Sequence, residues 1–378
     1  MPKPSEEELH NMKSSSVQFS NITIIGVGLI GGSLALAIKH RFPLIHITGV
    51  DRPYVLRRAL QRKAIDAAEP DVLKAIQQAN LIILATPISS ILKLLPIISS
   101  HISSNTIVTD TGSVKQAIVK DASILFPKGN FIGGHPMTGS EFSGINAAHP
   151  LLFQNAIYIL TPTKVNKISQ VNKLANFLGL LDARVLTMDA AMHDRIVAAV
   201  SHVPQLTAVA LMNTVGKNPL MRKQLSLAAG GFRDMTRIAS SPFDIWGEIL
   251  PNNKTEIKKV LQLLIRNLDK YAKHLETNPQ QLRKEFLSSR AIRSRIPRSM
   301  KGFITPLVDI AVFVQDKPGQ LARLTRVLAK AKINIKDIEL IKVREGRGGT
   351  FRISFDNRTI AQRAAAILKK DNFEIALD

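Results

Sequence analysis

Short apolar runs alternate with helical patterns along the chain from residue 19 to about residue 163. The runs rich in Ile, Val and Leu predict strands at residues 22–25, 45–50, 81–85, 106–110, 131–133 and 156–160. Between them, apolar positions recur every three or four residues, which is the period of a helix. Strands that alternate with helices predict a parallel sheet covered by helices, so we expect an α/β domain over residues 19–163. We expect the polar residues 1–18 to form a flexible segment.

From about residue 164 to residue 299 the strand pattern gives way to a helical one. We expect helices at 168–178, at 190–215 with an interruption near Pro204, and at 219–229, 244–250 and 253–275. These residues therefore predict an all-α domain over 164–299. A helical domain in this position commonly forms a substrate pocket and a dimer interface.

After a linker at residues 300–306 the pattern changes again. Strands are predicted at 308–314, 338–343, 350–355 and 373–377, and helices at 320–331 and 359–369, with a hairpin across Gly346–Gly349. The order βαββαβ predicts a ferredoxin-like module over residues 307–378.

The first predicted strand leads directly into a glycine-rich turn, Gly26-Val27-Gly28-Leu29-Ile30-Gly31. The spacing G-x-G-x-x-G between a strand and a helix is typical of a Rossmann-type dinucleotide site. Gly26 allows the tight turn, Gly28 lets a diphosphate approach the backbone, and Gly31 lets the helix pack close to the sheet. We expect the phosphates at the start of this helix, against Gly26, Gly28, Leu29, Ile30 and Gly31.

The second predicted strand ends in Asp51, about 20 residues beyond the glycines, where a ribose 2′-hydroxyl needs an acceptor. A carboxylate there repels a 2′-phosphate, so the sequence favours NAD. Arg52 follows directly, and Arg57 and Arg58 lie close by, which leaves NADP open as an alternative.

Polar residues follow three of the predicted strands. Thr86 and Pro87 follow residues 81–85, Ser113 follows 106–110, and His135 follows 131–133. Ligands bind beyond the carboxyl ends of parallel strands, so we expect these residues in one crevice. A histidine between Gly134 and Pro136 can act as a general base, although a loop histidine is more often structural.

Composition removes several classes of function. The chain has no cysteine, which excludes disulfides, thiolate metal sites and a thiol nucleophile. His193 and His202 fall on opposite faces of one predicted helix, so we expect no metal site. The net charge is +22, but aromatic content is 5% and the basic residues are dispersed, so we expect a basic surface that collects anions and no nucleic-acid site.

Nothing in the sequence predicts a membrane protein. The N-terminus lacks the basic-then-apolar order of a secretory signal. The most apolar stretch, residues 81–98, contains Pro87, Lys93 and Pro96 and predicts a strand and a buried helix. We expect a cytoplasmic protein.

Several motifs then stand in order: the glycine turn, Thr109–Lys115, Gly134–Glu141, His193-Asp194 with Ser201–Pro204, and Gly231–Ala239. Together, over about residues 20–300, they resemble the prephenate dehydrogenase family, to which arogenate and cyclohexadienyl dehydrogenases also belong. Asp316–Leu321 resembles the start of an ACT domain, a module that often binds amino acids.

The resemblance implies NAD-dependent oxidative decarboxylation of prephenate to 4-hydroxyphenylpyruvate, a step of tyrosine biosynthesis, in a homodimer. It implies that His135 is the catalytic base, that Ser113 holds His135 and the nicotinamide end, and that Arg237 binds a substrate carboxylate. The remaining substrate-site residues that it implies are Ser201, His202, Gln205, Glu141, His193 and Trp246, the last reaching across the dimer. For the ACT domain it implies an effector site at Asp316, Pro318, Gly319 and Gln320, with tyrosine as the natural effector.

One departure from the family keeps alternatives open. The family often has a second histidine at the position of Gln205, so the sequence does not decide between prephenate and arogenate. A β-hydroxyacid-type dehydrogenase and an amino-acid sensor that retains a dinucleotide fold are further alternatives. The intact glycines, together with Ser113, His135 and Arg237, argue against the sensor.

Overall fold

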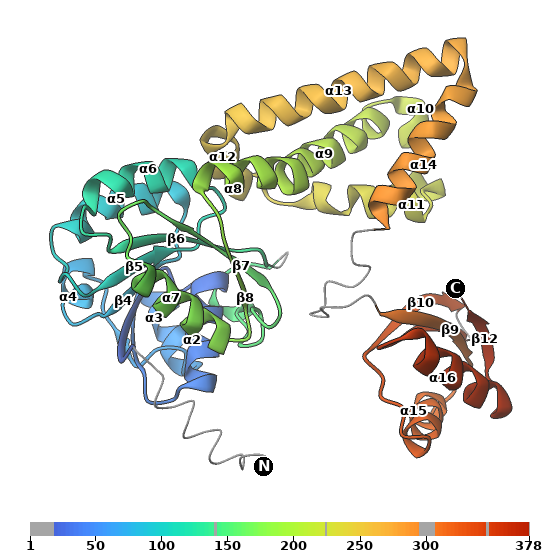
Figure 1. The fold of residues 1–378 in the computed structure, drawn as a ribbon, viewed down its shortest axis with the longest axis horizontal. Coiled ribbons are helices and arrows are strands. Elements are labelled where there is room, and N and C mark those ends of the chain that lie inside the picture. Colours follow the sequence, from blue (N-terminus) through green and yellow to red (C-terminus); the bar gives the residue numbers. More distant parts are fainter. Residues whose placement is uncertain (1–18, 140–141, 224, 295–306, 345–347, 378) are drawn as a thin grey trace. The chain divides into compact units, whose positions relative to one another are not determined.

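The computed structural model describes residues 19–139, 142–223, 225–294, 307–344 and 348–377 (Figure 1). Residues 1–18 and the expected linker 300–306 lie outside this part. The chain divides into two compact units, Met1–Asn278 and Pro279–Asp378.

The first unit is built on an eight-stranded sheet with the strand order β3-β2-β1-β4-β5-β6-β7-β8. Its strands are β1 (Asn21–Ile25), β2 (His46–Val50), β3 (Ala67–Ala68), β4 (Leu81–Leu84), β5 (Ile107–Asp110), β6 (Phe131–Pro136), β7 (Ile157–Pro162) and β8 (Arg184–Thr187). Strands β1 to β6 pair in parallel, as the sequence predicts.

The expectation of an all-parallel sheet is wrong at one junction, because β7 runs antiparallel to β6. A parallel neighbour needs a crossover connection, usually a helix. In its described residues, the segment between β6 and β7 contains only the short 3-10 turn η1 (Ile145–Ala147), and the chain returns in the opposite direction.

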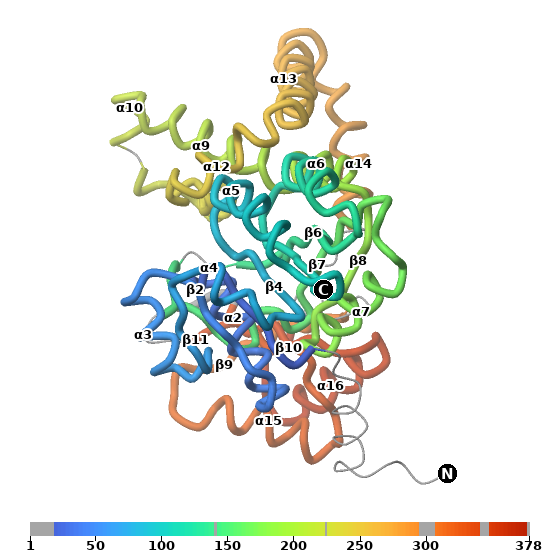
Figure 2. Tube along the Cα trace, turned by 90° about the vertical axis from the view of Figure 1, so that its left-hand side faces the viewer, coloured from blue at the N-terminus to red at the C-terminus, as the bar shows by residue number. Residues whose placement is uncertain are grey.

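Helices cover both faces of this sheet, as Figures 1 and 2 show. On one face lie α2 (Leu29–Arg41), α3 (Pro53–Gln61) and α7 (Ile168–Leu180), and on the other α4 (Val72–Ile76), α5 (Ile88–Ser99) and α6 (Gln116–Leu125). Because side chains alternate along a strand, Ile24 packs into the first layer and Ile25 into the second. The sheet therefore has an apolar core on both faces, as an α/β fold requires.

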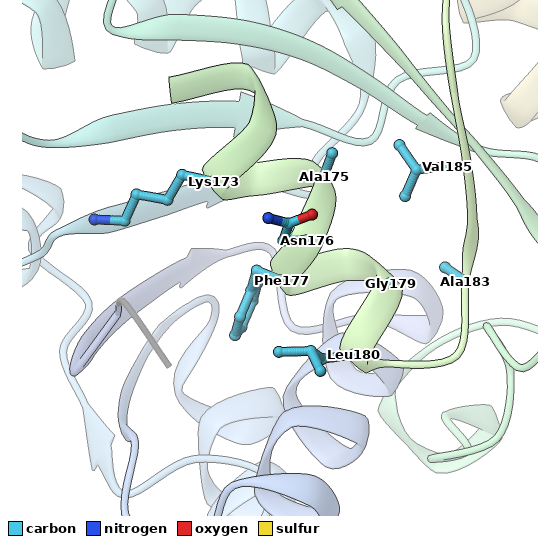
Figure 3. Close-up of a pocket in the computed structure, with 8 residues that line it drawn as sticks. All are labelled: Lys173, Ala175, Asn176, Phe177, Gly179, Leu180, Ala183 and Val185. Carbon is cyan, nitrogen blue, oxygen red and sulfur yellow. The ribbon is translucent and has the colours of Figure 1, made fainter. Parts of the chain in front are cut away.

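The sheet continues past residue 163, where we expected the helical part to begin. Helix α7 packs into the core through Leu174 and Phe177, and β8 pairs in parallel with β7. The sequence pattern missed β8 because the strand is short and only half apolar. A hollow of about 520 Å³ lies along α7 and β8, lined by Phe177, Leu180 and Val185 among others (Figure 3). None of the expected site residues lines it.

The following region is helical, as predicted. The long helix appears as α8 (Ala190–Val197), the π-turn η2 (Ala198–His202) and α9 (Val203–Gly216). The predicted interruption is confirmed and lies just before Pro204, which has no N–H to donate to the helix. Residues 190–216 are long and apolar enough to cross a membrane by length and composition. However, His193, Asp194 and His202 are buried in this stretch and hydrogen-bonded to other elements, as in a core helix.

Two more predicted helices are confirmed as α12 (Phe243–Asn252) and α13 (Lys254–Thr277). The helix expected at 219–229 is wrong in extent, because only α10 (Pro219–Arg222) and the 3-10 turn η3 (Leu225–Leu227) form there. Helix α11 (Gly230–Thr236) and the 3-10 turn η4 (Arg237–Ser240) were not predicted. Their double glycine at the start conceals the helical pattern.

The second unit begins with the 3-10 turn η5 (Pro279–Gln281) and α14 (Leu282–Arg293). The predicted βαββαβ order follows as β9 (Val308–Val314), α15 (Gln320–Lys330), β10 (Asp337–Arg344), β11 (Gly348–Phe355), α16 (Arg358–Lys370) and β12 (Glu374–Leu377). The sheet order is β10-β11-β9-β12 with antiparallel pairing, which confirms the ferredoxin-like module.

Candidate active site

The glycine turn has the geometry that a dinucleotide needs. Gly26 has φ of +93°, in the region that favours glycine, and a side chain on Gly31 would collide with the backbone oxygen of Gly26. A Cβ on Gly28 would meet nothing within 4 Å, so open space lies in front of the backbone there. Helix α2 starts at Leu29 without a side-chain cap, so its first N–H groups are available to an anion.

Asp51 is fixed at the end of β2. Its Oδ2 accepts the Val27 N–H at 2.8 Å and its Oδ1 accepts the Arg52 N–H at 2.7 Å. The carboxylate is thereby held beside the glycine turn, while the Arg52 side chain is 74% exposed. This arrangement fits the ribose of NAD and disfavours the 2′-phosphate of NADP.

Thr86 lies directly after β4 and beside the glycine turn, since a Cβ on Gly26 would be 2.8 Å from its Cγ2 atom. Its Oγ1 is buried, and among the described residues it has no hydrogen-bond partner. A buried hydroxyl without a partner costs free energy unless a ligand or water satisfies it. Thr86, the glycine turn and Asp51 together fit a bound NAD.

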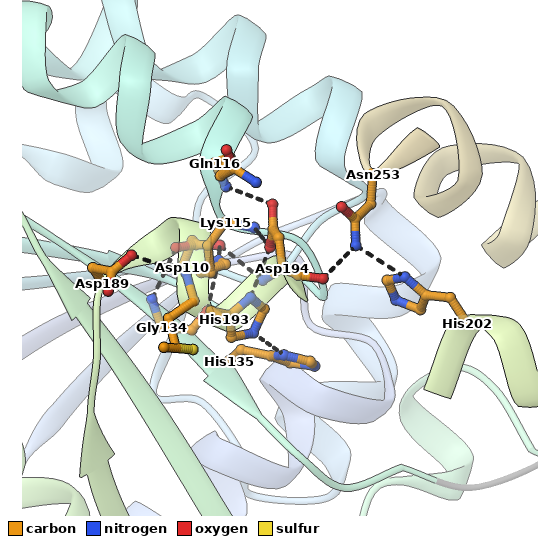
Figure 4. A network of polar contacts seen from close by, with 12 residues as sticks. Asp110, Lys115, Gln116, Gly134, His135, Asp189, His193, Asp194, His202 and Asn253 are labelled. Carbon is orange, nitrogen blue, oxygen red and sulfur yellow. Dashed lines mark hydrogen bonds and ion pairs between the residues drawn. The ribbon is translucent and has the colours of Figure 1, made fainter. Parts of the chain in front are cut away.

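His135 lies at the end of β6, half-buried, and its ring meets that of His193. The Nδ1 atom of His135 is 2.8 Å from the Nε2 atom of His193, and the ring planes are inclined at 67° (Figure 4). The Nδ1 atom of His193 is 2.7 Å from the Oδ1 atom of Asp194. Asp194 also accepts the backbone N–H groups of Lys115 at 2.7 Å and Gln116 at 2.9 Å, at the start of α6.

The surroundings of His135 favour the neutral ring. Burial lowers the pKa of His135 well below its ordinary value of 6.5, and the nearby His193, Lys115 and His202 lower it further. A neutral imidazole at the carboxyl end of β6 can accept a proton from a bound substrate.

A buried ion pair fixes the backbone next to His135. Lys115 and Asp110 are both fully buried and bonded to each other, and the Lys115 ammonium also donates to the Gly134 carbonyl at 2.7 Å. Asp110 accepts the Gly134 N–H at 3.0 Å. Burial lowers the pKa of Lys115, although Asp110 opposes that effect. Both peptide groups of Gly134 are thus held, which sets the direction in which His135 leaves the strand.

His202 is buried in the π-turn η2. Its Nδ1 lies 3.2 Å from the amide nitrogen of Asn253, which also donates to the Asp194 carbonyl at 2.8 Å. Because the amide donates to Nδ1, the proton of the neutral ring is on Nε2. Burial lowers the pKa of His202 to about 4.

Trp246 lies edge-on to His202, with ring centroids 6.0 Å apart. This contact lies within one chain, and the expected reach of Trp246 across a dimer stays a prediction. Asn253 and Trp246 therefore hold His202 against the segment that contains α12 and the start of α13.

The other expected residues are placed as follows. Gln205 is buried on α9 and donates to the Ile238 carbonyl at 2.9 Å, next to Arg237, which begins η4 with an exposed side chain. Ser113 lies half-buried between β5 and α6, and Ser201 lies half-buried in η2. Glu141 lies outside the described residues.

Sequence reasoning did not assign roles to Asp110, Lys115, Asp194 and Asn253. A signal was available for the first two, since a charged residue at the end of an apolar strand and a lysine five residues later suggest a buried pair. Asn253 gave none, because it precedes a helix and looks like an ordinary cap.

In the second unit, the expected effector residues form the exposed loop between β9 and α15. Gly319 has φ of +85° and is the N-cap of α15. Asp316, Pro318 and Gly319 are exposed and Gln320 is half-buried, so a ligand could reach this loop.

Comparisons with known proteins agree with this geometry. Family models match residues 34–187 (prephenate dehydrogenase, nucleotide-binding domain), 189–288 (prephenate dehydrogenase, dimerization domain) and 308–371 (ACT domain). The first match runs to the end of β8, past residue 163.

Individual relatives extend the comparison. The prephenate dehydrogenase of Bacillus subtilis is 36% identical, covering 91% of this chain and 94% of its own. The crystal structure of Synechocystis arogenate dehydrogenase matches with a TM-score of 0.66 and 32% identity over 73% of this chain and 99% of its own. The prephenate dehydrogenase of A. aeolicus, in complex with hydroxyphenyl propionate and NAD⁺, matches with a TM-score of 0.67 and 28% identity over 73% and 97%. The chain belongs to the prephenate dehydrogenase family, as a member that carries an ACT domain.

Proposed function

We propose that this protein catalyses the NAD-dependent oxidative decarboxylation of prephenate to 4-hydroxyphenylpyruvate. The observation that carries the proposal is the position of His135. It is a neutral imidazole at the carboxyl end of β6, in the same sheet edge as the glycine turn and Thr86. Bound NAD supplies the acceptor for the hydride that leaves C4 of prephenate.

The residues of the chain accept the proton of the C4 hydroxyl and bind the carboxylate of the substrate. As C4 loses its hydride, its hydroxyl becomes acidic, and His135 accepts that proton. The C1–carboxylate bond breaks, carbon dioxide leaves, and the bonding pair makes the ring aromatic. His135 returns the proton to the ring oxygen, so the overall reaction consumes and releases no proton.

The assignment of substrate contacts follows from charge and hydrogen-bonding capacity. Arg237 binds a substrate carboxylate, since a guanidinium can hold it through two hydrogen bonds. His202 offers its Nε2–H to the side-chain end of the substrate, because its Nδ1 is engaged with Asn253. Ser113 and Ser201 line the same site, with Glu141 as an expected member.

Purified protein, tested with prephenate or arogenate and with NAD or NADP, provides the direct test. We expect the largest kcat/KM with prephenate and NAD, followed as absorbance of the reduced cofactor. Equal or better turnover of arogenate would replace the substrate assignment, and turnover of neither would contradict the proposal. His135→Asn should lower kcat by ~10²–10⁴-fold and change the substrate KM much less.

We also propose a homodimer formed through the helical region. The residues matched by the dimerization-domain model include exposed apolar side chains such as Leu220, Leu227 and Phe243, which are 73–79% exposed. A groove of about 520 Å³ lies between α9 and α13, lined by Leu211, Met235 and Leu263 among others. Patches of this kind mark interfaces, and light scattering of the full chain should give the mass of a dimer.

We further propose that tyrosine binds the Asp316–Gln320 loop of the ACT domain and inhibits the enzyme, which we place in the cytoplasm. Inhibition requires that the active and inactive states differ in affinity for tyrosine. Added tyrosine should lower the rate of the wild-type protein and act more weakly on Asp316→Ala. Equal inhibition of both would remove the loop from the proposal.

A further inference from the structure

His193 uses both of its ring nitrogens inside the protein. It is fully buried, with Nε2 on His135 and Nδ1 on Asp194 (Figure 4). A ring engaged on both sides has no nitrogen left for the substrate. Its function is therefore to act on His135.

The hydrogen bonds of this chain have a defined direction. Backbone N–H groups can only donate, and those of Lys115 and Gln116 each point at one oxygen of Asp194. The carboxylate is therefore the acceptor on both oxygens, and the Nδ1 atom of His193 donates to it.

The donor and the acceptor between the two histidine rings follow from this. A neutral His193 that carries its proton on Nδ1 has a lone pair on Nε2, which accepts the Nδ1–H of His135. The proton of neutral His135 is thus on Nδ1, and its Nε2 carries the free lone pair.

We propose that His193 and Asp194 are positioning residues that fix His135 in the tautomer with Nε2 as the proton acceptor, and that Asp194 stabilises the imidazolium formed during turnover. The arrangement is like that of a catalytic triad, in which an aspartate orients the catalytic histidine, except that here a second histidine lies between them. The inference deepens the proposed function and rests on it for its kinetic test.

Several charged or titratable groups face the two rings and modify how strongly Asp194 stabilises a protonated His135. Lys115 faces His135 from the β5–α6 connection, with its charge balanced by Asp110. His202 faces it from η2. Asp194 is the carboxylate bonded to the ring chain itself, so it is the anion that responds to a proton on His135.

The same contacts couple the tautomer to the placement of the helical region. Asp194 belongs to α8, while the N–H groups that it accepts belong to the start of α6, on the nucleotide-binding sheet. The positive end of α6 attracts the carboxylate. The tautomer of His135 is thus fixed only when α8 is docked on α6.

The tautomer can be read directly by ¹⁵N NMR of protein labelled at histidine, without substrate or cofactor. His135 is assigned as the signal missing in His135→Asn. We expect Nδ1 of His135 to be protonated and Nε2 unprotonated near pH 7.5. His193→Gln, whose amide oxygen can still accept, should keep this form, and His193→Phe should lose it. An Nε2–H form of His135 in the wild-type protein would overturn the proposal.

The kinetic arm uses Asp194→Asn, with Asp189→Asn as the matched control. Asp189 caps the same helix by accepting the Met192 N–H at 2.9 Å, and asparagine caps equally well. Asp194→Asn should lower kcat by at least ~10-fold with little change in KM. It should also move the acid limb of kcat/KM to lower pH, because loss of the anion makes a protonated His135 less stable.

The outcomes separate the two proposals. A wild-type protein inactive on prephenate would contradict the proposed function, while the NMR result would still decide the tautomer. An active wild-type protein whose Asp194→Asn variant shows the same kcat and pH profile would overturn the inference. If Asp194→Asn fails to fold, His193→Phe against His193→Gln provides the same comparison without touching the contacts to α6.

Discussion

The side-chain amide of Gln205 donates to the Ile238 carbonyl at 2.9 Å, and so ties α9 to the turn η4 that begins at Arg237. Gln205 is only 4% exposed. Its side-chain amide donates to the backbone next to Arg237. We therefore expect Gln205 to act by placing Arg237.

Gln205→Leu should loosen that arginine. It removes one donor from the Ile238 carbonyl, which still accepts the N–H and the hydroxyl of Ser241, so the cost is that of one hydrogen bond, ~0.5–1.5 kcal/mol. We expect the KM for prephenate to rise by about two- to tenfold and kcat to change less. Steady-state kinetics measure both.

Thr207→Val is the matched control for Gln205→Leu. It removes a hydroxyl of the same helix that donates to the Val203 carbonyl at 2.8 Å, one turn earlier. Its KM should stay at the wild-type value. A Gln205→Leu variant with a lower kcat and an unchanged KM would assign the glutamine to the chemistry instead.

The two glycines of the cofactor turn should respond differently to the same methyl group. At Gly31 a Cβ would collide with the backbone of Gly26, which cannot move away, so Gly31→Ala should destabilise the fold. At Gly28 the Cβ enters open space, so Gly28→Ala should keep the wild-type melting temperature and lose NAD affinity by at least ~10-fold, because the diphosphate needs that space. Calorimetry gives both quantities, and a Gly28→Ala protein that binds NAD normally would place the diphosphate elsewhere.

Part of this fold could be predicted from the sequence alone. The strand–turn–helix unit around Gly26–Gly31 and the βαββαβ tail were predictable, because local propensity, glycine placement and apolar period agree there. Strand β8 and the reversal of β7 were not, since they depend on which free sheet edge the chain meets, and a short strand carries little pattern of its own.

The same division holds inside the site. His135 could be found because a strand ends beside it and glycine and proline flank it. Its partners could not be arranged from sequence, because Lys115, Asp194 and Asn253 come from three elements whose packing brings them together. The helix-face argument placed His193 and His202 on opposite faces of one helix, whereas both lie near His135. It gave no sign that Asn253 links His202 to the Asp194 carbonyl.

Cofactor choice should depend on one carboxylate. Asp51 lies beside the glycine turn with both oxygens held by backbone N–H groups, so we expect the wild-type protein to prefer NAD over NADP by at least ~100-fold in kcat/KM. Asp51→Asn removes the charge that repels a 2′-phosphate, and the preference should shrink by about tenfold or more. The ratio is measured with prephenate held at saturation.

Asp66→Asn is the control for that change. Asp66 also accepts a backbone N–H, that of Ile47, and pairs with Lys39, but at the opposite end of β2. Its loss should affect stability alone. If the two variants alter the NAD preference equally, the effect comes from net charge and the role given to Asp51 is wrong.

His202 should make the protein less stable as the pH falls from 7 to 4. Its pKa is about 4 in the folded protein, because burial disfavours the charged ring, against an ordinary value of 6.5. Between pH 6.5 and pH 4 His202 is protonated in the unfolded chain but neutral in the folded protein, so the free energy of unfolding falls as the pH falls. The loss is at most ~3 kcal/mol, is complete near pH 4, and is absent above about pH 7. His135, whose pKa is also lowered, adds to the loss in the same direction.

Urea unfolding followed by the fluorescence of Trp246, the only tryptophan, reports on this region. His202→Gln should flatten the pH dependence, whereas His101→Gln, which changes an exposed histidine, should leave it unchanged. Parallel curves for wild type and His202→Gln would mean that His202 titrates alike in the folded and unfolded chain.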